Sequence, residues 1–315
     1  MNKRNEAYDT IAGIMILCAI FLHTGVFMFK EYTPLHFFGF FMLWFFYKSG
    51  MFYRKSGINV KWFWNKIIRR LIIPFLVTGY FGYIFYCICN SLNVTESLHG
   101  MLSPIGTVMK GNAPCWFLIT FVGVKLMSEI LLRNLNIQAL GGAILLLLCL
   151  TISLHYWDKI HVVTILNSTM ALIYCLLGYL LRDVQYKRLV FYIALLLYFA
   201  IGLFYPSEIN IATTQLCYGN YEFSIVYNVA GIIVINNLFT KHQQLNLLPL
   251  RHIGKNSMTY FLFHYPVIIL VGWFCDNNQI TEIWRTVCVL CALLIVLPVF
   301  DWLMQKKEMK WIVGN

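Results

Sequence analysis

Residues 8–29, YDTIAGIMILCAIFLHTGVFMF, form an apolar stretch long enough to cross a bilayer as one helix. His23 is the one side chain deep in this stretch that titrates near neutral pH. At about 1.5 Å rise per residue it lies about 22 Å beyond Tyr8, in the far half of a hydrocarbon core about 30 Å thick. Because such a group is costly to hold in lipid, we expect His23 to face protein or water, either as a hydrogen-bonded packing residue or as a functional residue.

The whole chain has the composition of an integral membrane protein. Its 315 residues are 60% hydrophobic and 12% charged, whereas soluble domains are typically about one-quarter charged. The mean hydropathy is +0.69, and no long polar stretch separates one part of the chain from another. We therefore expect a single membrane domain over residues 1–315, with no appended soluble module.

Hydropathy predicts an all-α integral membrane fold, a single bundle of about ten transmembrane helices. The second predicted span is the least regular, because it is short and contains Lys48. The predicted spans are residues 8–29, 36–53, 71–90, 114–132, 136–154, 162–181, 189–205, 223–240, 256–275 and 283–304.

The basic residues are distributed unevenly between the two sides of this bundle. With the N-terminus in the cytoplasm, most of the 24 Lys and Arg residues fall at inner ends and loops. The outer side holds Lys30, Lys110, Lys159 and Arg285. This is the positive-inside pattern, which predicts both termini in the cytoplasm and an even number of spans. It also explains the net charge of +11 without a nucleic-acid partner.

Ten cysteines are present, and most lie inside the predicted spans. Cys288 and Cys291 form a C-x-x-C pair, but no second Cys or His pair lies nearby in the sequence. A tetrahedral metal site needs such a second pair, so we expect these residues to pack as small apolar side chains and expect no metal site.

A basic cluster, defined as Lys66, Arg69 and Arg70, stands directly before LIIPF at the inner mouth of the third span. Guanidinium groups bind phosphate oxygens in a bidentate manner, so the cluster suits a polyanion such as a nucleotide diphosphate. The alternative is that it serves topology and anionic lipid headgroups. The surrounding residues 61–70 suit an amphipathic segment at the membrane interface.

Two further stretches place polar groups inside spans. In FFYKSGMF (45–52), Lys48 could snorkel to the inner interface, and Gly50 permits a close backbone approach or a break in the helix. In IGKNSMTYFLFHYP (253–266), His264 lies at depth, and the following Pro266 frees backbone groups around it. Lys48 and His264 could each have a structural or a functional role.

Two outer loops, residues 91–113 and 206–222, are long and polar. The second contains Glu208 and Glu222. Long loops on the face above a histidine-bearing helix are where a polar substrate could be held.

Five sequence blocks follow one another along the chain: residues 8–14 with His23, Phe45-Phe46 with Ser49-Gly50, residues 66–74, Trp116-Phe117-Leu118, and residues 257–266. In this order they resemble the acyltransferase-3 family of multispanning membrane O-acyltransferases, which includes bacterial sugar O-acetyltransferases. Two departures stand out: Ala12 replaces an Arg that many members have in the first helix, and Lys66-x-x-Arg69 with Arg70 replaces the paired-Arg spacing. Lys48 could supply the missing positive charge.

The resemblance implies an enzyme of the bacterial cytoplasmic (inner) membrane. It would move an acyl group, which we expect to be acetyl, from cytoplasmic acetyl-CoA to a hydroxyl of a carbohydrate or lipid-linked glycan. Its partners would be that acceptor and membrane lipids. The basic cluster and Trp116 would bind acetyl-CoA. His23 would act as general base or carry the acyl group, and Lys48, Trp116 and His264 are candidates for stabilising the oxyanion.

Two other functions remain open at this point. A transporter or flippase of a polysaccharide or lipid-linked sugar would share the bundle and the interior bases, but it would not need a nucleotide-like site at the cytoplasmic face. A non-catalytic sensor or assembly factor would leave His23 without a task. CoA binding that is lost on changing Arg69 and Arg70 separates the first function from these two.

Overall fold

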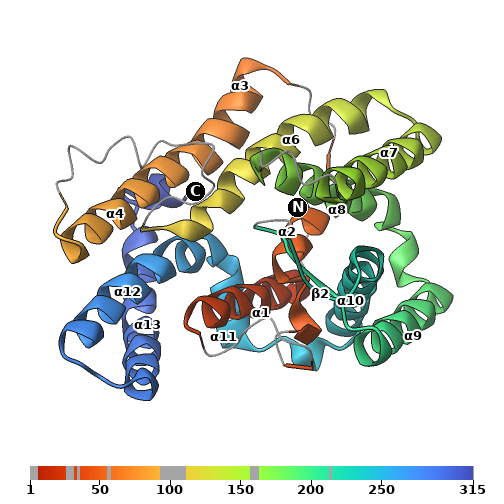
Figure 1. Cartoon of the computed structure of the whole chain (residues 1–315). Helices are drawn as coiled ribbons and strands as arrows, with labels where there is room; N and C mark the ends of the chain where they lie inside the picture. The colour runs from red at the N-terminus through yellow and green to blue at the C-terminus, as the bar shows by residue number, and fades with distance from the viewer. Residues whose placement is uncertain are drawn as a thin grey trace. The chain divides into compact units, whose positions relative to one another are not determined.

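The computed structural model describes residues 6–25, 32–33, 36–54, 58–92, 111–156, 163–212 and 215–314. Their regular elements are helices, together with one two-stranded hairpin (Figure 1). The loop residues 93–110 and three predicted outer lysines, Lys30, Lys110 and Lys159, lie outside the described residues.

The chain divides into two compact units, each assembled from stretches that are far apart in sequence. Helix α1 (Glu6–His23) contributes to both units, and its last turn, with His23, belongs to unit 2. Unit 1 comprises Met1–Ala19, Phe27–Gly57 and Gly123–Lys255, and unit 2 comprises Ile20–Val26, Ile58–Val122 and Asn256–Asn315.

In unit 1, helix α2 packs closely against α8, so that their backbones touch. A Cβ atom on Gly50 would overlap the carbonyl group of Cys175, and one on Gly178 would overlap that of Tyr47. The close approach predicted at Gly50 is therefore confirmed, and Gly178 matches it on the facing helix. Unit 1 contains η1 (His36–Phe38), α2 (Phe41–Met51), most of α6 (Trp116–Asn134), α7 (Ile137–Tyr156), α8 (Val163–Leu181), η4 (Val184–Tyr186), α9 (Arg188–Phe204), β1 (Glu208–Asn210), β2 (Gln215–Tyr218), α10 (Tyr221–Lys241), η5 (Gln243–Leu245) and α11 (Leu248–Lys255).

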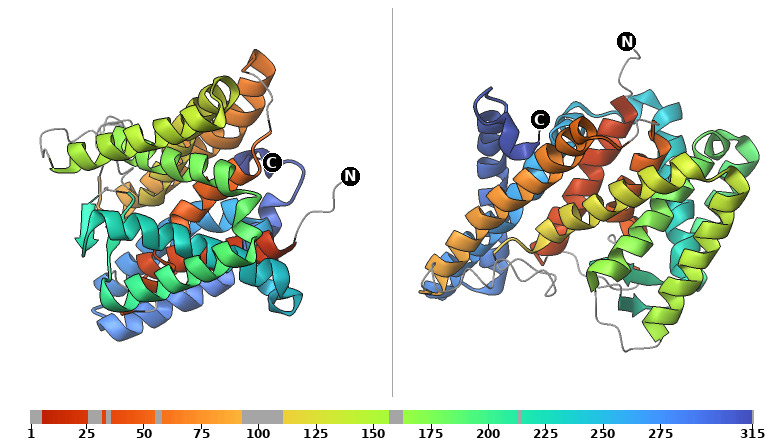
Figure 2. Two further views of the ribbon diagram at one scale, coloured as in Figure 1. Left: turned by 90° about the vertical axis from the view of Figure 1, so that its right-hand side faces the viewer. Right: turned by 90° about the horizontal axis from the view of Figure 1, so that it is seen from above.

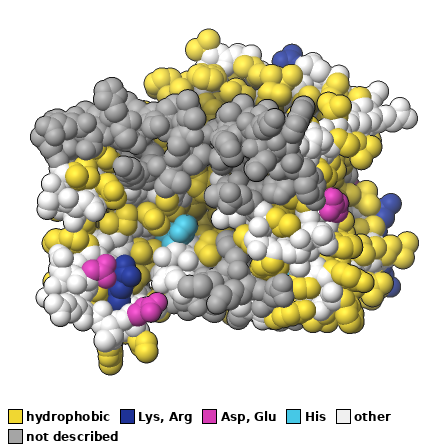
Figure 3. All heavy atoms as spheres, viewed as in Figure 1, with side chains coloured by type: hydrophobic (Ala, Val, Ile, Leu, Met, Phe, Trp, Pro, Cys, Tyr) yellow, Lys and Arg dark blue, Asp and Glu magenta, His cyan; other side chains and the backbone are white. Residues whose placement is uncertain are grey.

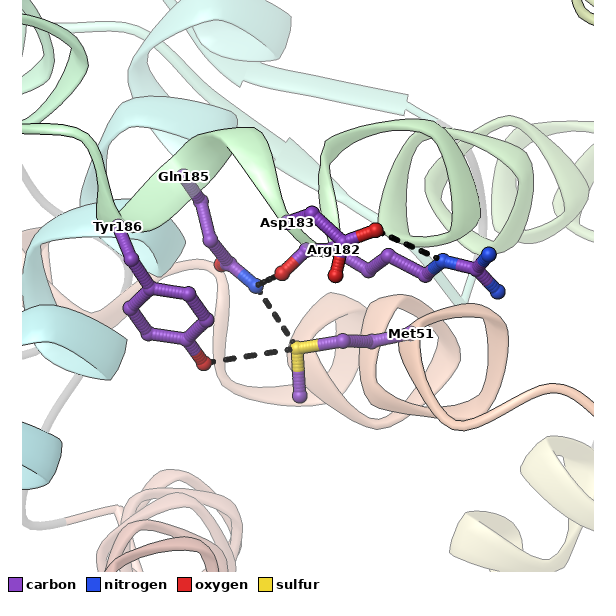
Figure 4. A network of polar contacts seen from close by, with 5 residues as sticks. All are labelled: Met51, Arg182, Asp183, Gln185 and Tyr186. Atoms are coloured by element: carbon purple, nitrogen blue, oxygen red, sulfur yellow. Dashed lines mark hydrogen bonds and ion pairs between the residues drawn. The ribbon is translucent and has the colours of Figure 1, made fainter.

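A small polar network fixes the turn after α8 to the end of α2 (Figure 4). Gln185 donates from Nε2 to the sulfur of Met51 at 2.9 Å and to the carbonyl oxygen of Arg182 at 3.2 Å. Tyr186 lies 4.0 Å from the same sulfur, and Arg182 pairs with Asp183 at 3.3 Å. Because a thioether accepts hydrogen bonds only weakly, the network orients η4 more than it stabilises the unit.

In unit 2, α12 lies beside both α4 and α13 (Figure 2). Phe263 of α12 stacks on Phe300 of α13 with ring centroids 4.5 Å apart, and Phe81 of α4 meets both rings edge-on. Large apolar rings packed in this way supply most of the local burial energy. Unit 2 contains α3 (Val60–Phe63), the π-helical segment η2 (Trp64–Ile72), α4 (Ile73–Cys89), η3 (Ala113–Cys115), α12 (Ser257–Asn277), α13 (Glu282–Met304) and η6 (Lys310–Val313).

Six described segments are long and apolar enough to cross a membrane. Three more apolar helices, Ile137–Ser153, Asn167–Leu181 and Arg188–Phe204, are shorter. The count of ten spans and the cytoplasmic position of both termini stay predictions. The six segments are Glu6–His23, Val60–Cys89, Ala113–Asn134, Tyr221–Lys241, Ser257–Asn277 and Glu282–Met304.

The second predicted span, residues 36–53, contains only the eleven-residue helix α2, which follows the short η1. Eleven residues rise about 16 Å, little more than half of a hydrocarbon core. Helix α2 alone is therefore too short to span a bilayer.

The described surface is rich in exposed large hydrophobic side chains, which are prominent among the coloured residues in Figure 3. Leu146, Leu196 and Leu294 are each at least 70% exposed. Such exposure would be unfavourable in water, and it is the surface expected of a protein whose helices face lipid.

Candidate active site

His23 and His264 lie together in unit 2, although they come from opposite ends of the sequence. His23 is the last residue of α1, and His264 lies in the middle of α12. Their ring centroids are 5.3 Å apart with an interplanar angle of 37°. The ring of Tyr265 meets His23 edge-on at 5.2 Å. The structure therefore brings together two of the residues that the sequence analysis proposed as catalytic.

The ring of His264 is held in one orientation by its own helix. Its Nδ1 lies 2.7 Å from the carbonyl oxygen of Phe261. A carbonyl oxygen can only accept, so we assign the hydrogen to Nδ1, which leaves the lone pair on Nε2. Among the described residues, the buried Nε2 has no hydrogen-bond partner. A buried acceptor without a partner is costly, so this atom is placed to accept from a donor that enters the site.

Asn112 secures the backbone of α12 next to His264. Pro266 has no N–H and so cannot donate to the carbonyl group of Leu262. Asn112 supplies the missing donor. Its Nδ2 donates to the Leu262 carbonyl oxygen at 3.0 Å and to the carbonyl oxygen of Thr78, in α4, at 3.2 Å. The buried amide thus joins α4 to α12 two residues from His264. This role of Asn112 was not predicted from the sequence. Pro266 indicates that the Leu262 carbonyl group lacks its helical donor, but not which side chain replaces that donor.

Trp116 is linked to His264 through two intervening aromatic rings. Phe261 is 6.0 Å from His264, Phe117 is 5.3 Å from Phe261, and Trp116 is 6.1 Å from Phe117, all measured between ring centroids. These contacts place Trp116 two rings away from His264. They favour a role in shaping the site over direct contact with the reacting atoms.

The basic cluster is exposed on the π-helical segment η2. The side chains of Lys66, Arg69 and Arg70 face outward, whereas Ile67 and Leu71 are buried. The predicted amphipathic character of this segment is therefore confirmed, although its π-helical form was not foreseen. π-Helical turns are rare and frequently occur at functional sites.

The basic cluster and the histidine pair are connected through α4. Thr78, whose carbonyl oxygen accepts from Asn112, follows Arg70 by eight residues, which is about 12 Å along a helix. Through Asn112 this level of α4 is joined to α12 near His264. The basic cluster and His264 therefore lie on helices that are joined to each other within unit 2.

Lys48 contacts the beginning of α1, the opposite end from His23. Its Nζ donates to the carbonyl oxygen of Tyr8 at 3.3 Å and lies 4.8 Å from the ring centroid of Trp44. In an α-helix this carbonyl lies one turn before Ala12. The ammonium group therefore stands near the turn that lacks the family's first-helix Arg, and its role in replacing that charge stays a prediction.

Loop 206–222, which the sequence predicts to lie on the outer side, contains the hairpin β1–β2, and this hairpin buries an acid instead of displaying it. Glu208 is completely buried, and its carboxyl group packs directly on the backbone of Gly39. Neither carboxyl oxygen accepts a hydrogen bond of good geometry from the described residues. Burial raises the pKa of Glu208 well above its usual range, and the nearby N–H of Ile209 offsets this only in part.

Comparison with known proteins gives one match. No curated protein and no solved structure matches the chain. A family model described as an acyltransferase domain, that of the acyltransferase-3 family, matches residues 5–302. The match spans nearly the whole chain and includes the histidine pair, Asn112 and the basic cluster. The chain therefore belongs to the acyltransferase-3 family and is a membrane acyltransferase.

Proposed function

We propose that this acyltransferase moves an acetyl group from cytoplasmic acetyl-CoA to a hydroxyl group of a carbohydrate or lipid-linked glycan. The observation that supports this most is the unpartnered Nε2 of His264 beside His23, in the same unit as an exposed basic cluster. The family supplies the reaction class, and the resemblance to sugar O-acetyltransferases supplies the donor and the acceptor.

The basic cluster would hold the donor through its phosphate groups. Two guanidinium groups and one ammonium group on one short exposed segment suit a polyanion better than a single phosphate. The acyl thioester would extend from there along α4 toward the histidines. A transporter of glycans would not need this cluster, and family membership favours group transfer over transport.

In the proposed reaction His23 is the general base. Neutral His23 accepts the proton of the acceptor hydroxyl while that oxygen attacks the thioester carbonyl carbon. The tetrahedral intermediate then collapses, the carbon–sulfur bond breaks, and the protonated His23 returns a proton to the departing thiolate. The products are the acetyl ester and free CoA.

His264 would set the tautomer of His23. If one N–H of His23 donates to the Nε2 of His264, the other nitrogen of His23 keeps its lone pair and faces the acceptor. A rotation of the His23 ring from the present 5.3 Å centroid separation would allow this bond, while His264 keeps its contact with Phe261. The arrangement parallels triads in which a third group orients the base.

A covalent route is the second candidate mechanism. His23 would attack the thioester itself, release CoA and pass the acetyl group to the acceptor in a second step. Incubating the enzyme with labelled acetyl-CoA and no acceptor distinguishes the routes. Label that stays on the protein and is lost in the His23→Ala variant supports the covalent route, and its absence supports general-base catalysis.

The donor site is tested by measuring CoA affinity in purified protein. Replacing both Arg69 and Arg70 with Gln should weaken binding, and the loss should be larger at low salt because ions screen phosphate contacts near water. The matched control replaces Lys187 and Arg188, an exposed adjacent basic pair in unit 1, with Gln. Unchanged CoA affinity in the Arg69/Arg70 variant would mean that the cluster serves topology alone.

A further inference from the structure

The residues that follow the family match fold back onto the basic cluster. The match ends at residue 302, and η6 (Lys310–Val313) comes shortly after it. Segment η6 packs against η2, α4, α12 and α13 within unit 2. Ile312 and Val313 are buried in this contact, with exposed fractions of 8% and 3%. A segment outside the family match is therefore an integral part of this unit.

The contact is closest between Gly314 and Arg70. A Cβ atom on Gly314 would lie 2.8 Å from the Cα atom of Arg70 and 2.9 Å from its carbonyl oxygen. Gly314 has a φ of +75°, a left-handed conformation that glycine adopts without strain. The two backbones therefore meet directly, and the glycine is needed both for its conformation and for the space it leaves.

The segment η2 is an unusual stretch of helix. Its π-helical form extends over nine residues, although π-helices mostly occur as single turns within α-helices. Ile67 and Leu71 are the buried residues of the nine, and the segment also packs against α4. The contact at the Arg70 backbone adds to these restraints on the side of the helix that carries the basic cluster, and so bears on the direction of the Arg69 and Arg70 side chains.

We propose that residues 310–314 form a clamp that positions Arg69 and Arg70 for the phosphate groups of the donor. Gly314 is then a positioning residue, which acts through Arg70 and does not touch the donor. The identity of the donor rests on the proposed function. Lys310, exposed at the start of η6, adds positive charge to the same contact region and favours a polyanionic ligand.

The clamp is tested with Gly314→Ala, which leaves every charge of the basic cluster in place. We expect the KM for acetyl-CoA to rise roughly tenfold with kcat little changed, as for a loss of binding that ground state and transition state share. Ile312→Ala, which loosens η6 without backbone strain, should act in the same direction. Gly141→Ala in α7, where a Cβ atom would meet nothing within 4 Å, is the matched control.

Three outcomes separate this inference from the donor site on which it rests. A raised KM in both clamp variants, with the salt dependence of CoA binding retained, supports the clamp. If Gly314→Ala and Ile312→Ala bind CoA as the wild type does and only melt at lower temperature, the clamp is wrong and the donor site stands. If the Arg69/Arg70 variant itself keeps full CoA affinity, the donor site is wrong and the clamp has no such function.

Discussion

Replacing His264 with Asn separates a catalytic role from a packing role at the histidine pair. The asparagine Nδ2 can take the position of Nδ1 and donate to the Phe261 carbonyl oxygen, so this backbone contact is replaced. The shorter side chain places no acceptor at the position of Nε2, so His23 loses this partner. The substitution therefore removes the unpartnered Nε2 with little change in the surrounding structure.

The structure bounds the two effects that this variant can have. A hydrogen bond inside a membrane bundle is worth about 0.6–2 kcal/mol, so imperfect replacement of the Phe261 contact should lower stability by no more than this. By contrast, a group that orients the catalytic base contributes about 10²–10⁴-fold to the rate. A modest loss of stability leaves nearly all of the protein folded and cannot reproduce such a loss of rate.

The assay measures transfer of labelled acetyl from acetyl-CoA at saturating donor, together with CoA affinity and thermal stability. We expect His264→Asn to lose at least about 10²-fold in kcat while its CoA affinity stays unchanged. Tyr265→Phe, next to His264 in the helix, is the control, since it keeps the ring that contacts His23 and removes only the hydroxyl. A His264→Asn enzyme within about threefold of the wild-type rate would refute the orienting role, because even weak acid–base assistance exceeds that factor.

Three further predictions concern the fold around the site. The pKa of Glu208 is raised in the folded state above the usual Glu value of about 4.3. Between these two pKa values Glu208 binds a proton in the folded state and loses it on unfolding, so stability should fall as pH rises. Glu208→Gln should remove this slope in thermal melts from about pH 5 to about pH 8. Asn112→Ala leaves the Leu262 carbonyl unpaired and should cost about 1–3 kcal/mol, measured by reversible denaturation in detergent. Gly178→Leu should prevent α2 from packing on α8 and give protein that is not monodisperse on size exclusion, whereas Gly141→Leu should be tolerated.

The sequence predicted the apolar helices well because each has a continuous run of hydrophobic residues. Which side of each helix faces which neighbour was harder to predict. His23 and His264 each lie on a helix that is apolar on most sides, so no hydrophobic face indicated which way either side chain points. Their contact depends on tertiary packing, which sequence periodicity does not encode.

Local features were predicted where the residue types of one short stretch determine them. Gly50 signalled a close helix contact, and the structure confirms it, but Gly178 could be recognised as its partner only from the packing. The amphipathic character of residues 61–70 followed from their mixture of basic and aromatic side chains, whereas the π-helical hydrogen bonding did not. The contact of η6 with η2 joins residues more than 200 positions apart, and no sequence pattern in either segment predicts it.

The most direct test of the account is His23→Gln in the purified enzyme, with acetyl transfer and CoA binding measured on the same preparation. The amide can keep a hydrogen bond but cannot cycle a proton near neutral pH. We expect transfer to fall by at least about 10²-fold while CoA affinity stays at the wild-type value, because in the proposed function the basic cluster, and not His23, holds the donor phosphates. Transfer at close to the wild-type rate would make His23 a packing residue and contradict the proposed mechanism.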